Sequence, residues 1–449
     1  MGGSKSKAIK KHAKVAFTDS ELEILEVYFE LLKCHDQING YLTQKSMVQE
    51  FPENPDFSIK LYNWMRERCK NQQIDYTNFV ITLELLLKDQ QEYYLSDYKF
   101  RVLEKFELFA LISLGCLENE KEAINRFQVS YSQGSTVIKE LLNMYYFNKE
   151  VTNSQRNDLA ARSVANSIFD QKASLPFNQF IGQAKQQLIY ANKMCKLYFT
   201  KKFIQPHLKY GIPTLTSSSF ILNDKILALL QMSSPDFNRI KQLDLKFSSS
   251  VGYDDLEHIT EIIIESQQPL LFIFRNREDE TQNDSFQQQI FGAYISIDQT
   301  IETHFIRKQQ KDPMGILYNP NDQVSLYFGD EKSFLFSLQP KYQLFMSTFD
   351  MKSKQCFAYI NSRAFNLKVP QPYGLGFGGD GKGNFRIWID ENLKGNATNR
   401  INNSCDQTYE MGYLLEPHIE FLNLTSIEIW GVLFEEKETR NSSQNKFRN

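Results

Sequence analysis

At 449 residues the chain exceeds what one hydrophobic core usually supports, so its length predicts two or three domains. Hydrophobic residues make up 41% of the sequence, which is ample for folded cores and excludes a disordered chain. The net charge of -3 supplies no general basic field, and so argues against a nucleic-acid partner.

No apolar run reaches the roughly 18 residues that a membrane span requires, and the N-terminus lacks the apolar core of a secretory signal. The six cysteines stand singly without a C-x-x-C pair, which is typical of reduced thiols in a cytosolic protein. They are Cys34, Cys69, Cys116, Cys195, Cys356 and Cys405.

The first segment, residues 1–16, has the pattern of an acylated and basic membrane anchor. Gly2 and Ser6 fit the N-myristoylation pattern M-G-x-x-x-[ST]. Five lysines follow before the first acidic residue, Asp19, and supply the second signal that a single acyl chain needs on an anionic membrane. These lysines are Lys5, Lys7, Lys10, Lys11 and Lys14. The alternative is a solvated basic tail.

Helical periodicity dominates residues 17–205 and predicts an all-α domain. A capping box formed by Thr18 and Glu21 precedes apolar residues at helical spacing up to Leu32. Further helical patterns cover Ile59–Cys69, Asn78–Asp89, Tyr98–Leu117, Glu120–Phe147 and Asp158–Phe169.

Two stretches of this region have the rhythm of calcium-binding helix–loop–helix units. With Gly40 at the glycine position, His35 stands first and Ser46 twelfth, while the second loop runs from Glu67 to Asn78. Calcium needs six to eight oxygens, including a bidentate Glu at the twelfth position. Neither loop supplies them, so we expect EF-hand-like packing units without calcium. Leu175–Phe180 is a weaker candidate for a further unit.

The second half changes character after Ile212. One helix is expected around Leu222–Met232, and short segments rich in aromatic and β-branched residues then predict strands of a sandwich. These segments are Leu270–Phe274, Phe291–Ile297, Ser333–Leu338, Phe357–Ile360, Phe385–Ile389 and Ser426–Gly431. The predicted fold is therefore α+β, with helices flanking the sandwich.

Six sequence blocks, in order, resemble the TLDc domain family over residues 212–434, followed by a polar tail at 435–449. The blocks are Phe272–Phe274, Phe291–Tyr294, Phe334–Leu338, Gly374–Gly379, Phe385–Asp390 and Ile427–Gly431. The family motif residues are Gly374, Gly376, Gly378, Gly379, Trp388, Asp390, Glu428, Trp430 and Gly431. One departure from the family is the stretched segment Gly395–Tyr409.

The whole layout resembles the branch that contains a lysosomal, mTOR-associated TLDc protein. The resemblance implies a non-catalytic interaction protein at the cytoplasmic face of lysosomes or other acidic organelles. Its expected partner is the peripheral sector of a vacuolar-type proton pump, with oxidative-stress protection as a broader phenotype. The alternatives are a scaffold in mTOR-type nutrient signalling, an undiscovered enzyme and a component of a cytoskeletal assembly.

The glycine-rich block also matches two phosphate-binding patterns. Gly374, Gly376 and Gly379 satisfy G-x-G-x-x-G, and Gly376 through Lys382 satisfies G-x-x-x-x-G-K. Both motifs need a helix directly after the glycines, whereas a strand pattern follows here. We therefore expect a glycine-rich turn that lets backbones approach closely, and no nucleotide or other cofactor.

Catalytic and metal-binding patterns are absent from the sequence. The six histidines show no H-x-x-x-H or H-E-x-x-H spacing, and there is no G-x-S-x-G elbow. Asp390, Glu428 and His258 could still converge in the fold. Separate structural roles, as a turn carboxylate, a buried hydrogen-bonded acid and a surface imidazole, are the favoured interpretation.

Overall fold

The computed structural model describes the chain in segments that divide into two compact units. The described residues are 17–34, 41–69, 71–88, 103–116, 124, 126–146, 156–207, 213–234, 237–251, 255–266, 268–277, 288–297, 327–348, 356–362, 372–379, 384–393, 396–397, 406–415, 422 and 424–434. The first unit comprises Met1–Ile212 and Asp224–Ser234, and the second comprises Pro213–Asn223 and Pro235–Asn449. The chain therefore passes between the units three times, and each unit is considered by itself.

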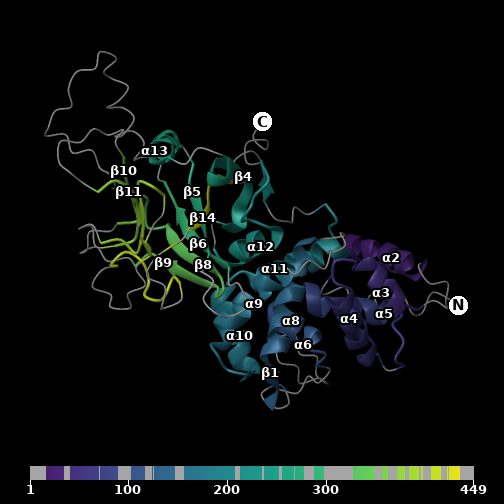
Figure 1. Cartoon of the computed structure of the whole chain (residues 1–449). Helices are drawn as coiled ribbons and strands as arrows, with labels where there is room; N and C mark the ends of the chain where they lie inside the picture. Colours follow the sequence, from purple (N-terminus) through teal and green to yellow (C-terminus); the bar gives the residue numbers. More distant parts are fainter. Residues whose placement is uncertain are drawn as a thin grey trace, which may run out of the picture. The chain divides into compact units, whose positions relative to one another are not determined.

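The first unit is built mainly of helices (Figure 1). Their bounds are α2 (Asp19–Cys34), α3 (Gln44–Glu50), α4 (Pro55–Glu67), α5 (Tyr76–Leu87), α6 (Lys105–Ser113), α8 (Tyr131–Asn143), α9 (Arg156–Phe169), α10 (Phe177–Gln187), α11 (Ala191–Phe203) and α12 (Asp224–Ser233). Five predicted helical patterns overlap α2, α4, α5, α6 and α9. The sequence pattern missed α3, α10 and α11.

The expectation of an all-α first half is wrong in detail, because short antiparallel pairings join its loops. Strand β1 (Gln128–Ser130) pairs with β2 (Ser174–Pro176), with Val129 opposite Leu175. An isolated bridge joins Leu42 to Ile74 in the same way. The predicted helix Glu120–Phe147 is therefore interrupted by β1, since backbone N–H and C=O groups in that loop pair across to another loop rather than along a helix.

A local capping interaction starts three of the helices that follow these pairings. The side chains of Thr43, Asp75 and Ser130 accept hydrogen bonds from backbone N–H groups three residues on, at the starts of α3, α5 and α8. Each bond satisfies one of the N–H groups that a helix N-terminus leaves unpaired. Since Ser130 closes a capping box with Gln133, the β1 strand ends where α8 must begin.

Helix α12 belongs to the helical unit although its sequence lies beyond residue 212. It packs on α8 and α9. Its Lys225 is fully buried, and the ammonium group donates to the side-chain oxygen of Asn143 on α8. Asn143 in turn donates to Asn54 at 3.4 Å. These contacts fix a helix predicted at Leu222–Met232 into the first unit, because a buried ammonium must keep its hydrogen-bond partner.

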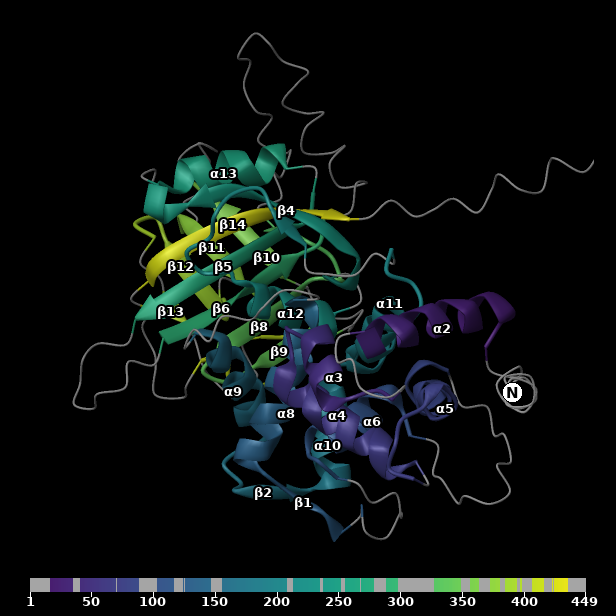
Figure 2. The same ribbon diagram turned by 90° about the vertical axis from the view of Figure 1, so that its right-hand side faces the viewer.

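The second unit is a sandwich of two sheets (Figures 1 and 2). The seven-stranded sheet has the order β3 (Thr214–Leu215), β4 (Ile240–Ser248), β14 (Leu424–Phe434), β5 (Leu270–Arg277), β6 (Gln288–Ile295), β8 (Phe334–Gln339) and β9 (Gln343–Met346). The five-stranded sheet has the order β13 (Asn396–Ala397), β12 (Ile387–Asp390), β11 (Gly374–Phe377), β10 (Ala358–Asn361) and β7 (Tyr327–Phe328).

One hydrophobic core lies between the two sheets. Phe272 and Phe274 of β5 contact Phe377 of β11, with ring centroids 5.0 and 5.9 Å apart. The core also receives Leu256 and Ile259 from helix α13 (Leu256–Glu265), which the sequence analysis did not predict. The six predicted strand segments coincide with β5, β6, β8, β10, β12 and β14, so the expected sandwich is confirmed.

Strand β14 is the last described element of the chain, yet it lies in the middle of its sheet. It pairs with β4 on one side and β5 on the other. Its residues Ile427 to Val432 are buried. The sheet is therefore completed only when the C-terminal strand inserts between strands that come much earlier in the sequence.

Candidate functional site

The glycines of β11 make room for aromatic side chains. Gly374 and Gly376 point to the same face of the strand, and a Cβ atom on either would collide with the ring of Trp388 or Phe385. Those two rings stack at 4.9 Å with planes 18° apart, and Tyr359 lies 5.0 Å from Phe385. The first two glycines of the phosphate-like motif thus belong to a strand under an aromatic stack, which corrects the expectation that the whole block is a turn.

After β11 the chain turns at Gly378 and Gly379, whose φ angles are +65° and +128°. Such backbone conformations favour glycine. A Cβ atom on Gly378 would lie 2.8 Å from the carboxylate of Asp406. The chain continues into β12, so the strand expected after the motif is confirmed. Gly381 and Lys382 lie outside the described residues.

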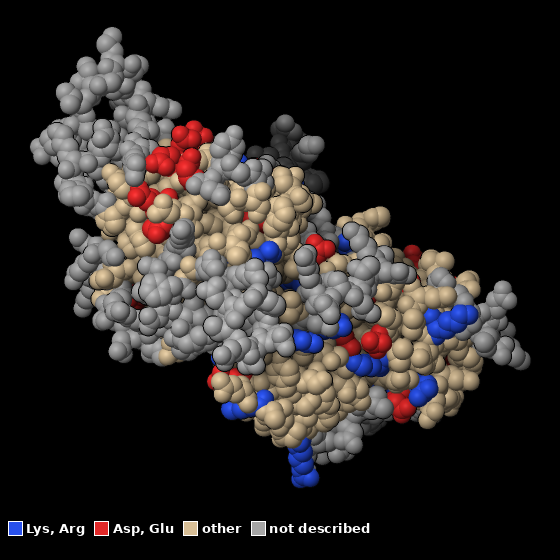
Figure 3. All heavy atoms as spheres, viewed as in Figure 1, with Lys and Arg blue, Asp and Glu red and all other residues tan. Residues whose placement is uncertain are grey.

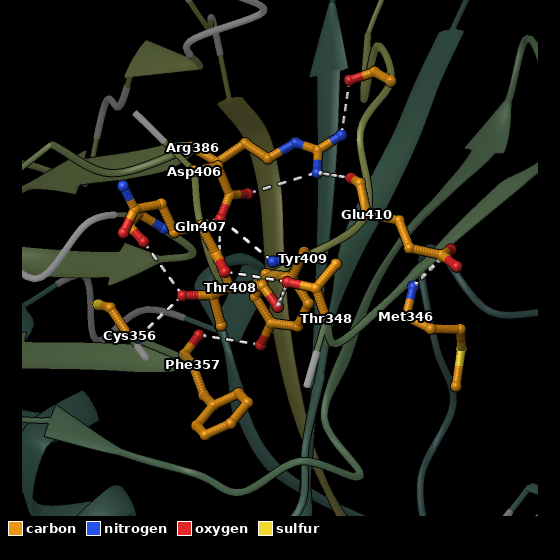
Figure 4. A network of polar contacts seen from close by, with 12 residues as sticks. Met346, Thr348, Cys356, Phe357, Arg386, Asp406, Gln407, Thr408, Tyr409 and Glu410 are labelled. Atoms are coloured by element: carbon orange, nitrogen blue, oxygen red, sulfur yellow. Dashed lines mark hydrogen bonds and ion pairs between the residues drawn. The ribbon is translucent and has the colours of Figure 1, made fainter. Parts of the chain in front are cut away.

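Asp406 organises the segment that meets this turn (Figure 4). One of its carboxylate oxygens accepts hydrogen bonds from the backbone N–H groups of Gly379 and Thr408, both at 3.0 Å, and of Tyr409 at 3.2 Å. The other oxygen lies 3.4 Å from the guanidinium of Arg386 on the segment entering β12. One carboxylate therefore joins the glycine turn to the 406–410 segment.

Arg386 fixes the following turn. Its guanidinium donates to the carbonyl oxygens of Glu410 at 2.7 Å and Gly412 at 2.6 Å, and lies 4.1 Å from the ring centroid of Phe345. Burial lowers the pKa of Arg386, while Asp406 opposes that effect. The backbone on both sides of Met411 is consequently held by one buried cation, which needs these partners because it is largely removed from water.

Thr408 and Tyr409 attach the same segment to further strands. The Thr408 hydroxyl accepts from the Cys356 N–H at 2.8 Å and donates to the Gly379 carbonyl at 3.1 Å. Tyr409 donates to the Phe357 carbonyl at 3.0 Å. Burial, with Asp406 adding to it, raises the pKa of Tyr409 well above its ordinary value, so this hydroxyl stays protonated as a donor. We call Arg386, Asp406, Thr408 and Tyr409 with their partners the Arg386–Asp406 network.

Glu428 forms a second buried polar site in the same unit. Its carboxylate is fully buried and accepts from the Ser219 hydroxyl at 2.6 Å, the Phe220 N–H at 2.7 Å and the Trp430 indole N–H at 3.1 Å. Ser219 also accepts from the N–H groups of Ile221 and Leu222. Glu428 on β14 thereby ties down the 213–223 segment, which comes before α12 in the chain.

The remaining motif residues have separate local roles. Asp390 ends β12 and accepts from the Asn392 N–H at 2.9 Å in a turn. His258 lies on α13, where its ring is 6.1 Å from that of Phe247. Gly431 of β14 makes room for the side chain of Gln268. Asp390, Glu428 and His258 thus occupy the smaller sheet, the larger sheet and a helix, and each has different partners.

No group of three or more metal-ligating side chains is found among the described residues. Acidic residues do gather along α13, where Figure 3 shows them at the surface, but they follow one exposed helix face. Burial raises the pKa of the Cys69 thiol to about 11, whereas a nucleophilic cysteine requires a lowered pKa. Gly2 and the five N-terminal lysines lie outside the described residues, and no described helix is both long and apolar enough to cross a membrane.

Residues 215–433 match the family model described as the TLDc domain. The chain carries a TLDc domain. A comparison with curated proteins gives no match. The matched range contains both polar sites described above, together with the segment that forms α12.

The polar residues that hold this TLDc domain together were only partly visible in the sequence. Arg386 lies within the Phe385–Asp390 block, where a lone cation among apolar strand residues indicates a buried ion pair. Asp406 lies in the stretched 395–409 segment and carried no such signal. TLDc domain proteins are generally non-catalytic, and the geometry of both sites, with carboxylates saturated by backbone and side-chain donors, serves attachment of chain segments.

Proposed function

We propose that the protein is a non-catalytic, membrane-tethered interaction protein, whose TLDc domain docks on the cytosolic peripheral sector of a vacuolar-type proton pump and modulates it. The match of residues 215–433 to the TLDc domain carries this proposal, because that domain suggests an interaction-protein family associated with the pump and with oxidative stress. The cytoplasmic face of lysosomes or other acidic organelles is the proposed location.

The geometry of the TLDc domain supports docking over catalysis. The Arg386–Asp406 network uses hydrogen bonds to fix the backbone of the 406–412 segment at the surface of the sandwich. A segment held in one conformation loses little conformational entropy on binding, which favours recognition by a partner. Exposed residues of this segment include Met411, which is 74% exposed.

The helical unit supports an EF-hand-like interpretation without calcium. Counting from His35 and Glu67 as first positions, the bridged residues Leu42 and Ile74 both stand eighth in their loops. The ninth positions, Thr43 and Asp75, accept hydrogen bonds from the N–H groups of the twelfth, Ser46 and Asn78. The side chains at the twelfth positions lack a carboxylate, so this unit is proposed as a scaffold rather than a calcium sensor.

Affinity capture with the full-length chain tests the proposal. The full chain is needed because α12 packs with the helical unit, so a fragment starting near residue 212 would strip that helix of its neighbours. The chain is immobilised and incubated with solubilised membranes of acidic organelles. We expect recovery of peripheral pump subunits.

Two other outcomes separate the alternatives. Recovery of mTOR-type kinase components without pump subunits would favour a lysosome-surface scaffold in nutrient signalling. If the protein is an enzyme, Asp390→Asn and Glu428→Gln should abolish its cellular phenotype, such as protection against oxidative stress, while partner capture is unchanged. Loss of phenotype together with loss of capture contradicts that alternative and supports docking.

A further inference from the structure

Helix α2 (Asp19–Cys34) leaves an apolar row of side chains in solvent. Ile24, Val27 and Leu31 are 41%, 62% and 59% exposed, and their spacing of three and four residues places them in one row. The opposite face is buried through Leu25, Phe29 and Leu32. Among the described helices, no other carries more than one exposed large hydrophobic residue. We call Ile24, Val27 and Leu31 the α2 stripe.

An acidic row runs beside the α2 stripe. Asp19, Glu23, Glu26 and Glu30 are all exposed, and their spacing of four, three and four residues also follows one side of the helix. Glu30 has a local partner in Lys33 at 2.8 Å. The outward surface of α2 is therefore both apolar and negatively charged.

The apolar stripe and the acidic row together restrict what kind of partner can bind to the outward surface of α2. An anionic membrane would repel the acidic row, although it could accept the stripe. A second copy of the helix would bring two acidic rows together, which like-charge repulsion opposes. The surface instead fits a segment that offers lysines and aliphatic side chains together.

Such a segment directly precedes the helix in the sequence. Residues 5–16 read Lys-Ser-Lys-Ala-Ile-Lys-Lys-His-Ala-Lys-Val-Ala, with five lysines, two large aliphatic residues and no acid. We propose that residues 5–16 dock on the α2 stripe when the chain is away from a membrane, with lysines against the acidic row and Ile9 or Val15 on the stripe.

The chain is long enough for this contact. A 16-residue helix such as α2 measures about 24 Å at about 1.5 Å per residue. Ile9 lies ten residues before Asp19, and ten extended residues span at most about 33–36 Å. Ile9 can therefore reach the far end of α2, where Cys34 is exposed.

Docking would regulate the membrane contact of the same lysines. The five lysines cannot face the acidic row of α2 and an anionic lipid surface at once, so the two contacts compete. This consequence rests on the proposed membrane contact, whereas the docking itself does not. Two measurements on the full-length, non-acylated protein therefore test the docking separately from its effect on membrane binding.

The first measurement is disulfide trapping between Ile9→Cys and the native Cys34. We expect an intrachain disulfide, because two cysteines bridge only when their Cα atoms come within about 7 Å. Adding Val27→Ser with Leu31→Ser should slow its formation at least about tenfold, since the stripe loses its apolar contact. The matched control is Ile189→Ser, an equally exposed aliphatic residue in the same unit, at 51%.

Equal trapping rates in the stripe variant and the Ile189→Ser control would overturn the docking proposal. Interchain Cys34–Cys34 dimers without an intrachain product would overturn it as well, by assigning the α2 stripe to a second copy.

The second measurement is co-sedimentation with vesicles of phosphatidylcholine containing about one-third phosphatidylserine. The stripe variant should bind at least about fivefold more strongly than the Ile189→Ser control, because its lysines are released. Faster trapping in the Ile9→Cys protein than in its stripe variant, together with equal vesicle binding, would leave the docking intact and overturn its regulation of the membrane contact. Equal trapping rates and equal vesicle binding in the stripe variant and the Ile189→Ser control would overturn both the docking and its regulation of the membrane contact.

Discussion

Two kinds of polar contact differ in how far apart along the sequence their partners lie. In the helical unit, Thr43 and Asp75 bond to N–H groups three residues away, which starts a helix. In the β unit, Glu428 holds Ser219, which is 209 residues distant, and Arg386 holds Asp406, 20 residues distant. The comparison teaches that a helix cap sets a local element, whereas Glu428 and Arg386 join segments that only the complete fold brings together. Contacts of the second kind also occur in the helical unit, where Lys60 donates to Glu140, 80 residues distant.

Asp406→Ala should give the largest loss of stability. It removes the acceptor of three backbone N–H groups and leaves Arg386 buried without its carboxylate, which costs about 3–5 kcal/mol. Urea unfolding followed by tryptophan fluorescence measures the change, because Trp388 and Trp430 lie in the β unit. Asp390→Ala, in an exposed turn, is the matched control. Equal losses of stability in Asp406→Ala and Asp390→Ala would show that the Arg386–Asp406 network stabilises the unit no more than an ordinary turn carboxylate does.

Glu428→Ala should have the next largest effect. Three donors lose their buried acceptor, which costs about 2–3 kcal/mol. Because Ser219 and Phe220 belong to the segment that Glu428 holds, limited proteolysis should cut within residues 213–223 faster than in wild type. Glu428→Gln keeps the side-chain shape and one acceptor oxygen. Its cleavage rate should therefore lie between those of wild type and Glu428→Ala. Unchanged cleavage in Glu428→Ala would show that the segment is held by other contacts.

Asp75→Ala should destabilise the helical unit by only about 1 kcal/mol, since a single helix cap is lost. Circular dichroism during urea unfolding measures the helical transition. Ser130→Ala offers an independent cap of the same kind at the start of α8. If either substitution costs as much as Asp406→Ala, the contrast between local and long-range polar contacts fails.

A smaller effect should appear in the pH dependence of the helical unit. Burial raises the pKa of Glu140, although the Lys60 ammonium at 2.6 Å opposes this. A carboxyl group with a raised pKa binds its proton more readily when folded, so stability falls as pH rises from about 4.3 through the raised value. This group contributes a slope of at most about 1.4 kcal/mol per pH unit. Glu140→Gln should remove that slope from unfolding curves measured across pH, and an unchanged slope would contradict the assignment.

The sequence predicted elements with strong local patterns and missed those set by distant partners. Apolar periodicity located α2, α4 and α5, and aromatic strand segments located β5 and β6. Strand β1 was missed because its Gln128–Ser130 backbone pairs with β2, 46 residues on, and a helical pattern runs through it.

The candidate site was predictable to a similar degree. The TLDc motif placed Gly378, Gly379 and Glu428 in positions where each has a structural role. The aromatic stack over Gly374 and Gly376 was not foreseen, because contact between β11 and the rings of Phe385 and Trp388 arises only when the strands pair. Asp406 was missed for a similar reason, since two of its partners, Gly379 and Arg386, are brought to it only by the fold.

The most direct measurement of the central claim is equilibrium binding between the purified full-length chain and the purified peripheral sector of a vacuolar-type proton pump. The docking account predicts saturable binding that Asp406→Ala weakens more than Asp390→Ala under conditions where both variants are folded. An absence of binding by the wild-type chain would contradict the account, and so would binding that neither change affects.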